Sequence, residues 1–193
     1  MVDPDNITDY HRSDSELQEF ILFCAVVAGK SAHQQTKKLD AFLKLYPEIR
    51  GDKSPFEYVW ALSEKNKLRS ALEAVKMGQY NRLTTAFEML TAINLRTCQP
   101  EDLEAVPGIG MKSSRFFIVH SREGAEYAIL DTHILRYMRE VLSIETPKST
   151  PSGNKYLRLE KEYLEYAKSQ NMSLADLDLQ IWLSYRTPDQ EAA

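Results

Sequence analysis

Hydrophobic residues recur every three to four positions along most of this chain, which is the spacing of an α-helix with one buried face. No stretch alternates between apolar and polar residues for more than a few positions, so strands are not expected. The pattern predicts an all-α protein of about nine helices. They lie at 17–27, 31–46, 55–62, 68–77, 80–95, 111–122, 131–144, 156–167 and 174–185.

Polar residues mark where several of these helices begin and end. Ser13 and Ser54 each precede a glutamate three positions later, the spacing of a capping box. Pro47 is expected to end the second helix. The segment 146–154 contains two prolines and a glycine and is expected to be an exposed loop.

One short stretch, Val106-Pro-Gly-Ile-Gly-Met-Lys112, separates a short apolar-periodic run at 100–105 from the helix at 111–122. Gly108 and Gly110 can adopt positive φ and carry no side chain, so the backbone can approach another molecule closely. The first N–H groups of the following helix, at Gly110, Met111 and Lys112, are then free to bind a phosphate. Residues 100–122 are therefore predicted to form a helix-hairpin-helix, which holds nucleic acid through its backbone.

Two residues near this hairpin suggest chemistry. Lys112 lies in the first turn of its helix, where the helix dipole and any burial disfavour a charged ammonium, and a neutral amine is a nucleophile. Asp131 opens the next helix as its expected N-cap. The segment 123–130, if extended, spans roughly 26 Å and can return the chain from the end of one helix to the start of the other. Taken singly, each residue is also explained as a solvated lysine or a simple cap.

The combination Leu103…Val106-Pro-Gly-Ile-Gly-Met-Lys112…Leu130-Asp-Thr-His-Ile134 resembles the helix-hairpin-helix DNA glycosylase superfamily, which includes endonuclease III. The segments 23–32 and 172–182 are similar to the archaeal-type 8-oxoguanine DNA glycosylase/AP lyases, which lack an iron–sulfur cluster. The resemblance implies that Lys112 is the nucleophile and Asp131 its catalytic acid partner.

The resemblance also implies which residues meet DNA. Contacts to the DNA are expected from Val106, Gly108, Gly110, Met111, Arg115, Lys30 and His133. The pocket for the base is expected to include Asp176, Asp178 and Trp182. Helix capping or a solvated face would also explain the two aspartates, and a buried apolar stripe would also explain the tryptophan. Relatives carry a C-terminal lysine that helps to read 8-oxoguanine. This chain ends Gln190-Glu-Ala-Ala193, so its exact base specificity is left open.

We expect one glycosylase domain over 1–193, built from two helical subdomains. One comprises residues 31–96, and the other combines 1–30 with 97–193 and contains the hairpin. The active site is expected in the cleft between them, where small ligands usually bind.

Composition restricts the remaining possibilities. Apolar residues make up 43% of the chain and charged residues 27%, which is ordinary for a globular protein in water. Only two cysteines are present, too few for an iron–sulfur cluster, and the polar N-terminus does not resemble a secretory signal. We therefore expect a cytoplasmic monomer, nucleoid-associated in a prokaryote, with no cofactor and no membrane partner. The histidines have no metal-ligand spacing, so the only metal considered is a monovalent cation at the hairpin carbonyls.

The net charge of −4 is unusual for a DNA-binding protein, but residues 106–122 carry three cations and no acid. The resemblance therefore implies a bifunctional DNA glycosylase/AP lyase that acts on damaged double-stranded DNA and excises 8-oxoguanine through a lysine Schiff base and β-elimination. Two alternatives stay open: the same lysine chemistry on another modified base, and a non-catalytic helix-hairpin-helix module that only binds DNA.

Overall fold

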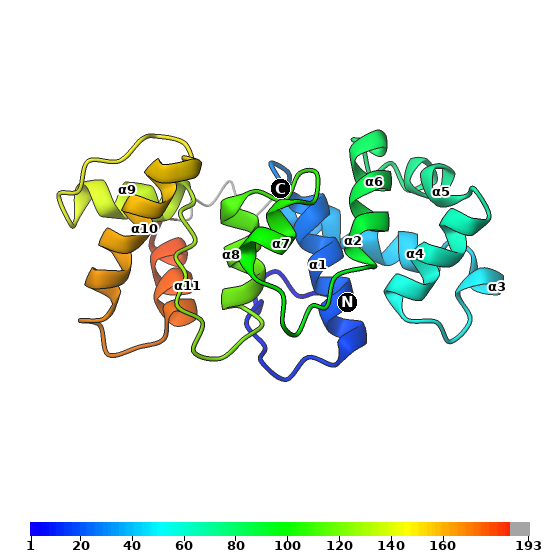
Figure 1. Ribbon diagram of the computed structural model, residues 1–193, viewed down its shortest axis with the longest axis horizontal. Helices are drawn as coiled ribbons and strands as arrows, with labels where there is room; N and C mark the ends of the chain where they lie inside the picture. Colours follow the sequence, from blue (N-terminus) through cyan, green and yellow to red (C-terminus); the bar gives the residue numbers. More distant parts are fainter. Residues whose placement is uncertain (186–193) are drawn as a thin grey trace. The chain divides into compact units, whose positions relative to one another are not determined.

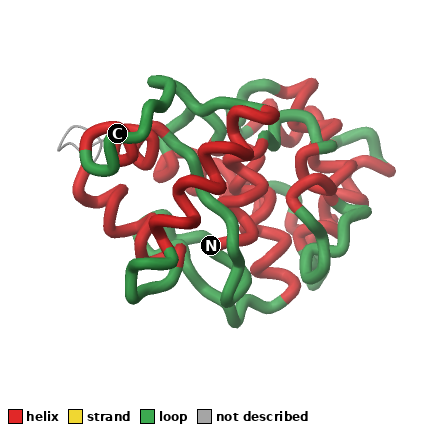
Figure 2. The backbone as a smooth tube through the Cα atoms, turned by 60° about the vertical axis from the view of Figure 1, so that its left-hand side comes forward, coloured by secondary structure: helices red, strands yellow, loops and turns green. Residues whose placement is uncertain are grey.

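The computed structural model describes residues 1–185 of the chain, and residues 186–193 lie outside the described part. Within residues 1–185 every regular element is a helix, as Figure 2 shows, and this confirms the all-α class. The helices divide into two compact units. Unit 1 contains residues 1–7 and 11–109, and unit 2 contains residues 8–10 and those from 110 onward.

Unit 1 is built around α1, whose apolar residues face inward on almost every side. Its neighbours are α2, α4 and α6, which pack directly against it. A helix that is apolar all round must be covered all round, and Phe20, Ile21, Leu22 and Val26 are each completely buried. The helices of unit 1, labelled in Figure 1, are α1 (Asp14–Val27), α2 (Ala32–Lys44), α3 (Pro47–Arg50), α4 (Pro55–Glu64), α5 (Leu68–Ala74), α6 (Tyr80–Leu90) and α7 (Pro100–Glu104).

The predicted capping boxes start α1 and α4. In both, the serine side chain accepts from the N–H of the third helical residue, and the glutamate there accepts from the serine N–H. α2 ends at Lys44, three residues before Pro47, and Pro47 opens α3, a single extra turn with the proline at its first position. The structure accordingly has eleven helices within residues 1–185, more than the spacing of apolar residues predicts.

The division into units differs from the two subdomains expected from the sequence. The first helix packs with the middle of the chain, because its apolar surface is covered by α2, α4 and α6. The boundary near the hairpin falls between Ile109 and Gly110, so the hairpin turn closes unit 1 and the helix after it opens unit 2.

Unit 2 contains α8 (Met111–Val119), α9 (Thr132–Glu140), α10 (Gly153–Ala167) and α11 (Leu174–Tyr185). The last three helices share a core with the segment that leads into α9. The residues of this core that are completely buried are Leu130, Leu135, Met138, Tyr156 and Leu159. The predicted loop at 146–154 is present up to Ser152, which is the N-cap of α10. The C-terminal residues Gln190–Ala193, on which the question of base specificity depends, lie outside the described residues.

Candidate active site

The hairpin turn is tight, and its geometry requires glycine at one position only. The N–H of Val106 donates to Leu103 O and that of Ile109 donates to Val106 O, both at 3.0 Å. Gly108 has φ of +89°, and a Cβ added to it would lie 1.6 Å from Nη1 of Arg82. The guanidinium of Arg82 thus fills the space that a side chain at this position would need.

Gly110, which was expected to use the freedom of glycine in the same way as Gly108, does not adopt positive φ. It is the N-cap of α8 with φ of −97°, and no atom lies within 4 Å of a Cβ built on it. Positive φ and local crowding therefore do not explain this glycine. The open space beside it lies next to the first-turn N–H groups of Met111 and Lys112, which have no acceptor inside a helix.

Lys112, Phe116 and His120 form a stripe on α8, because positions four apart lie above one another on a helix. The ammonium of Lys112 lies 5.7 Å from the centre of the Phe116 ring. The Phe116 ring in turn meets the imidazole of His120 edge-to-face, with centroids 4.6 Å apart. Lys112 is half-buried at one end of this stripe, and His120 is buried at the other.

Asp131 caps α9, as the sequence predicts. Its Oδ1 accepts from the N–H groups of His133 and Ile134, both at 2.8 Å. Burial, and then the negative charge of Asp178, raise the pKa of the Asp131 carboxyl, while the Ile134 N–H, His133 and Lys112 act in the opposite direction. A carboxyl in this environment can hold a proton more readily than an exposed aspartate does.

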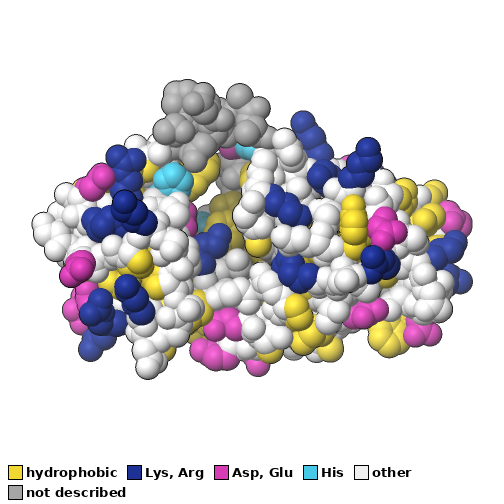
Figure 3. Space-filling view, turned by 90° about the horizontal axis from the view of Figure 1, so that it is seen from above, with side chains coloured by type: hydrophobic (Ala, Val, Ile, Leu, Met, Phe, Trp, Pro, Cys, Tyr) yellow, Lys and Arg dark blue, Asp and Glu magenta, His cyan; other side chains and the backbone are white. Residues whose placement is uncertain are grey.

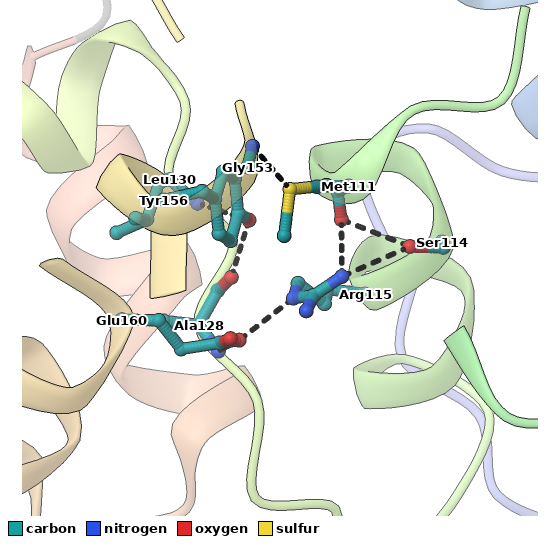
Figure 4. A network of polar contacts seen from close by, with 8 residues as sticks. All are labelled: Met111, Ser114, Arg115, Ala128, Leu130, Gly153, Tyr156 and Glu160. Carbon is teal, nitrogen blue, oxygen red and sulfur yellow. Dashed lines mark hydrogen bonds and ion pairs between the residues drawn. The ribbon is translucent and has the colours of Figure 1, made fainter. Parts of the chain in front are cut away.

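A buried polar network fixes the start of α8 relative to the segment before Asp131 (Figure 4). The Nε of Arg115 pairs with Oε1 of Glu160 at 2.8 Å, and its Nη1 donates to Met111 O, the residue before Lys112. The same Glu160 oxygen accepts from the N–H of Ala128 at 3.0 Å.

Tyr156 also binds the segment directly before Asp131 through two hydrogen bonds. Its hydroxyl donates to Ala128 O at 2.7 Å and accepts from the N–H of Leu130 at 3.1 Å, directly before Asp131. Two side chains of α10, Tyr156 and Glu160, therefore connect the elements that carry Lys112 and Asp131.

Arg115 was expected to contact DNA, and the structure corrects this expectation. Its side chain is 2% exposed and is used by Glu160 and the carbonyl of Met111. Its ring neighbours are Tyr156, 4.9 Å from the guanidinium carbon, and Tyr127 at 5.8 Å. The charge of Arg115 belongs to the interior of unit 2.

The expected base-pocket residues are placed differently from one another. Asp176 is exposed, and it bonds to the hydroxyl of Ser173 at 2.7 Å at the start of α11, so it is a capping residue and is not brought to the site. Asp178 approaches His120, with Oδ2 3.5 Å from Nε2. The Trp182 ring meets the His133 ring edge-to-face at 6.4 Å, beside the Asp131 cap.

Lys30 belongs to unit 1. Its ammonium donates to Met77 O at 2.8 Å, and burial, followed by the charges of Arg82 and Lys38, lowers its pKa. Val106, which was expected to contact DNA, is 1% exposed and belongs to the interior of unit 1.

His120 is the residue that sequence reasoning missed. The sequence shows that His120 lies eight positions after Lys112, on the same side of a helix. It does not show the partners of His120, because they come from distant parts of the chain. The hydroxyl of Thr8 lies 2.8 Å from Nδ1, and Asp178 faces Nε2.

Among residues 1–185, no three His, Cys, Asp or Glu side chains form a group able to hold a metal ion. No helix in this part of the chain is both long and apolar enough to cross a bilayer. On the face drawn in Figure 3, Lys and Arg side chains lie interspersed with Asp and Glu.

Comparison with known proteins gives consistent matches. Residues 56–172 match the family model described as 8-oxoguanine DNA glycosylase. An 8-oxoguanine DNA glycosylase/AP lyase of Methanocaldococcus jannaschii is 27% identical over 181 residues, which cover 89% of this chain and 81% of that protein. One of Saccharolobus islandicus is 35% identical over 83 residues, 42% of this chain and 40% of the relative.

The fold is also found among solved structures. The crystal structure of the M. jannaschii 8-oxoguanine glycosylase/lyase, in complex with a 15mer DNA containing 8-oxoguanine, matches with a TM-score of 0.62. The match covers 91% of this chain and 83% of that one at 22% identity.

Proposed function

Because this chain belongs to the 8-oxoguanine DNA glycosylase family, we propose that it is a DNA glycosylase/AP lyase that removes 8-oxoguanine from double-stranded DNA. The observation that carries the proposal is the position of Lys112 and Asp131 within unit 2. The amine stands at the start of α8, the carboxyl at the start of α9, and the charge of Lys112 acts on the carboxyl. The network around Arg115 and Glu160 supports this placement.

Base removal would begin with the damaged nucleotide outside the duplex, because the glycosidic bond is not accessible inside the stack. The unprotonated Nζ of Lys112 attacks C1′ of the sugar. The bond from C1′ to N9 of the purine breaks, and its electron pair leaves with the base, which takes up a proton. Formation of the Nζ–C1′ bond turns the amine into a cationic secondary ammonium with two hydrogens, and one of these passes as a proton to Asp131. The negative charge of Asp131 also stabilises the cationic sugar in the transition state.

Strand cleavage would follow from the same lysine. Opening of the sugar ring gives an imine between Nζ and C1′, and this cationic Schiff base makes the hydrogens at C2′ acidic. A base removes one of them, the electron pair forms the C2′–C3′ double bond, and the 3′ phosphate leaves with the C3′–O pair. Hydrolysis of the imine then releases Lys112 for another cycle.

The DNA backbone would be bound by the hairpin. A phosphate placed beside Gly110 meets the first-turn N–H groups of α8 and the positive end of its dipole. Such contacts hold DNA without reading its sequence. We also propose that Lys30 and His133 contact DNA, that Trp182 and Asp178 border the base, and that the protein acts as a monomer.

Borohydride trapping tests the proposal, because it reduces a Schiff base to a stable amine. Wild-type protein with a duplex that contains 8-oxoguanine should give a covalent protein–DNA adduct, and Lys112→Gln should give none while still binding the duplex. Lys161→Gln, which changes an exposed lysine of α10, is the matched control and should trap normally.

A panel of duplexes separates the alternatives. Faster adduct formation on an oxidised pyrimidine than on 8-oxoguanine would change the proposed substrate and keep the lysine chemistry. Absence of an adduct and of cleavage on every lesion, with duplex binding intact, would instead leave a DNA-binding module. Trapping that persists in Lys112→Gln would assign the nucleophile to another amine.

A further inference from the structure

His120 is buried at the inner end of the stripe on α8 and has a polar group near each ring nitrogen. Only 1% of this residue is exposed, yet it stands between the hydroxyl of Thr8, at 2.8 Å from Nδ1, and the carboxylate of Asp178, at 3.5 Å from Nε2. These two partners come from separate parts of the chain, Thr8 from the segment before α1 and Asp178 from α11. A buried imidazole held in this way has a defined orientation.

The two neighbours bear on which ring nitrogen of His120 carries a hydrogen. In a neutral ring whose hydrogen is on Nε2, Nδ1 accepts from the Thr8 hydroxyl. In the charged ring both nitrogens carry hydrogen. A hydrogen on Nε2 is favoured by the negative charge of Asp178, whose Oδ2 lies 3.5 Å from this nitrogen.

Asp178 connects this histidine to Asp131. It lies on α11, is 15% exposed on its side chain, and its charge acts on Asp131 at the start of α9. The charge of Asp178 also acts on Tyr156 and Tyr163 of α10, where burial is the main cause that raises each pKa.

Other titratable groups complete the surroundings. Lys112 from α8 and His133 from the first turn of α9 both act on Asp131 in the opposite direction to Asp178. The hydroxyl of Tyr163 is buried and has no hydrogen-bond partner among the described residues. Nε2 of His120 lies 3.5 Å from Oδ2 of Asp178, which is an ion-pair distance without the geometry of a hydrogen bond.

We propose that His120 is a positioning residue for catalysis, which holds the Asp178 carboxylate beside Asp131 and thereby sets the pH range in which Asp131 accepts the proton of Lys112. Without His120, Asp178 can turn toward solvent, and its charge then acts on Asp131 more weakly. This inference rests on the proposed function, since it assigns a role within the same site.

The sign of the effect follows from like-charge repulsion. A nearby negative charge makes a carboxyl harder to ionise, so loss of that charge lets Asp131 ionise at lower pH. Excision requires Asp131 as the base and therefore declines on the acid side as Asp131 becomes protonated. Weakening the action of Asp178 should move this acid limb to lower pH.

The experiment is single-turnover excision of 8-oxoguanine measured across pH. We expect Asp178→Asn and His120→Leu to move the midpoint of the acid limb to lower pH, and the double variant to move it no further than Asp178→Asn alone. His120→Gln, which offers an amide N–H close to the position of Nε2, should restore a midpoint near that of the wild type. A purely structural role would reduce the rate at every pH and leave the midpoint in place.

His33→Leu is the matched control, because it removes a histidine paired with an aspartate, Asp5 at 3.0 Å, in unit 1. Its acid limb should not move. If His120→Leu does not fold, Asp178→Asn and His120→Gln still decide the question. An unmoved midpoint in Asp178→Asn, or a further shift in the double variant, overturns the inference. Wild-type protein that neither excises nor traps would refute the proposed function itself, which is a separate outcome.

Discussion

Arg115 and Glu160 form an ion pair inside unit 2, with Nε and Oε1 2.8 Å apart and side chains only 2% and 9% exposed. The pair joins α8 to α10, and through the N–H of Ala128 it also reaches the segment that leads to Asp131. A charge pair in such a place is costly to disrupt on one side only, because the other charge is left buried without its partner.

Glu160→Ala should lower the free energy of unfolding by about 3–5 kcal/mol, the usual cost of removing one partner of a buried pair. Urea unfolding near neutral pH measures this difference. Glu162→Ala is the matched control, since Glu162 lies on the same helix in a more exposed pair with Arg158 at 3.6 Å. Its change should stay within about 0.5 kcal/mol. Equal losses in the two variants would show that the buried pair has no special role.

Gly108→Ala should destabilise unit 1. Positive φ costs a residue with a side chain about 1–2 kcal/mol, and the added Cβ would also displace the guanidinium of Arg82. The measurement is the urea midpoint, with Gly29→Ala as the control, because Gly29 has φ of +70° but open space around its Cβ. A loss no larger in Gly108→Ala than in Gly29→Ala would mean that Arg82 moves aside at little cost.

Gly110→Ala should keep the fold and weaken DNA binding. The position has negative φ and open space, so the folded chain accommodates a methyl group, while a phosphate near the first turn of α8 does not. Affinity for undamaged and lesion-containing duplexes should decline by the same factor, because backbone contacts to phosphate carry no sequence information. Fluorescence anisotropy with both duplexes tests this. A decline confined to the lesion duplex would place Gly110 at the base pocket.

Local signals in the sequence predicted much of the fold. Capping boxes at Ser13 and Ser54, the cap at Asp131 and the turn around Gly108 depend on neighbouring residues, and the structure has all four. The extra helix α3 was not predicted, because a single turn is too short for the spacing of apolar residues to be seen.

The candidate site was predicted less completely, since its contacts join residues far apart in the sequence. Arg115 looks like a surface cation until Glu160, 45 positions later, is placed beside it. The same holds for His120, whose partner Asp178 lies on the last described helix. A pattern of charge along the chain cannot show which cations are buried, because burial is decided by tertiary packing.

Asp131→Asn separates the catalytic role of this residue from its capping role. Asparagine caps a helix about as well as aspartate, so the bonds to His133 and Ile134 should persist and the fold should be retained. The negative charge is lost, and single-turnover excision of 8-oxoguanine should slow by about 10²–10³, as happens when one electrostatic stabiliser is removed from other enzymes. Near-normal excision in a folded variant would reduce Asp131 to a cap.

The stability of the same variant should depend on pH in a direction set by the raised pKa of Asp131. In the folded protein the carboxyl holds its proton to higher pH than it does unfolded, so ionisation costs stability as the pH rises above the ordinary value of 3.8 through the raised one. Asparagine does not ionise. The melting temperature of Asp131→Asn, relative to that of the wild type, should therefore increase between about pH 4 and pH 7.

Asp9→Asn, in which an exposed aspartate of unit 2 is changed, is the control and should show no such increase. A melting-temperature difference that stays constant over this range would mean that burial and Asp178 do not destabilise the charged form of Asp131, and the pH argument for His120 would lose its physical basis.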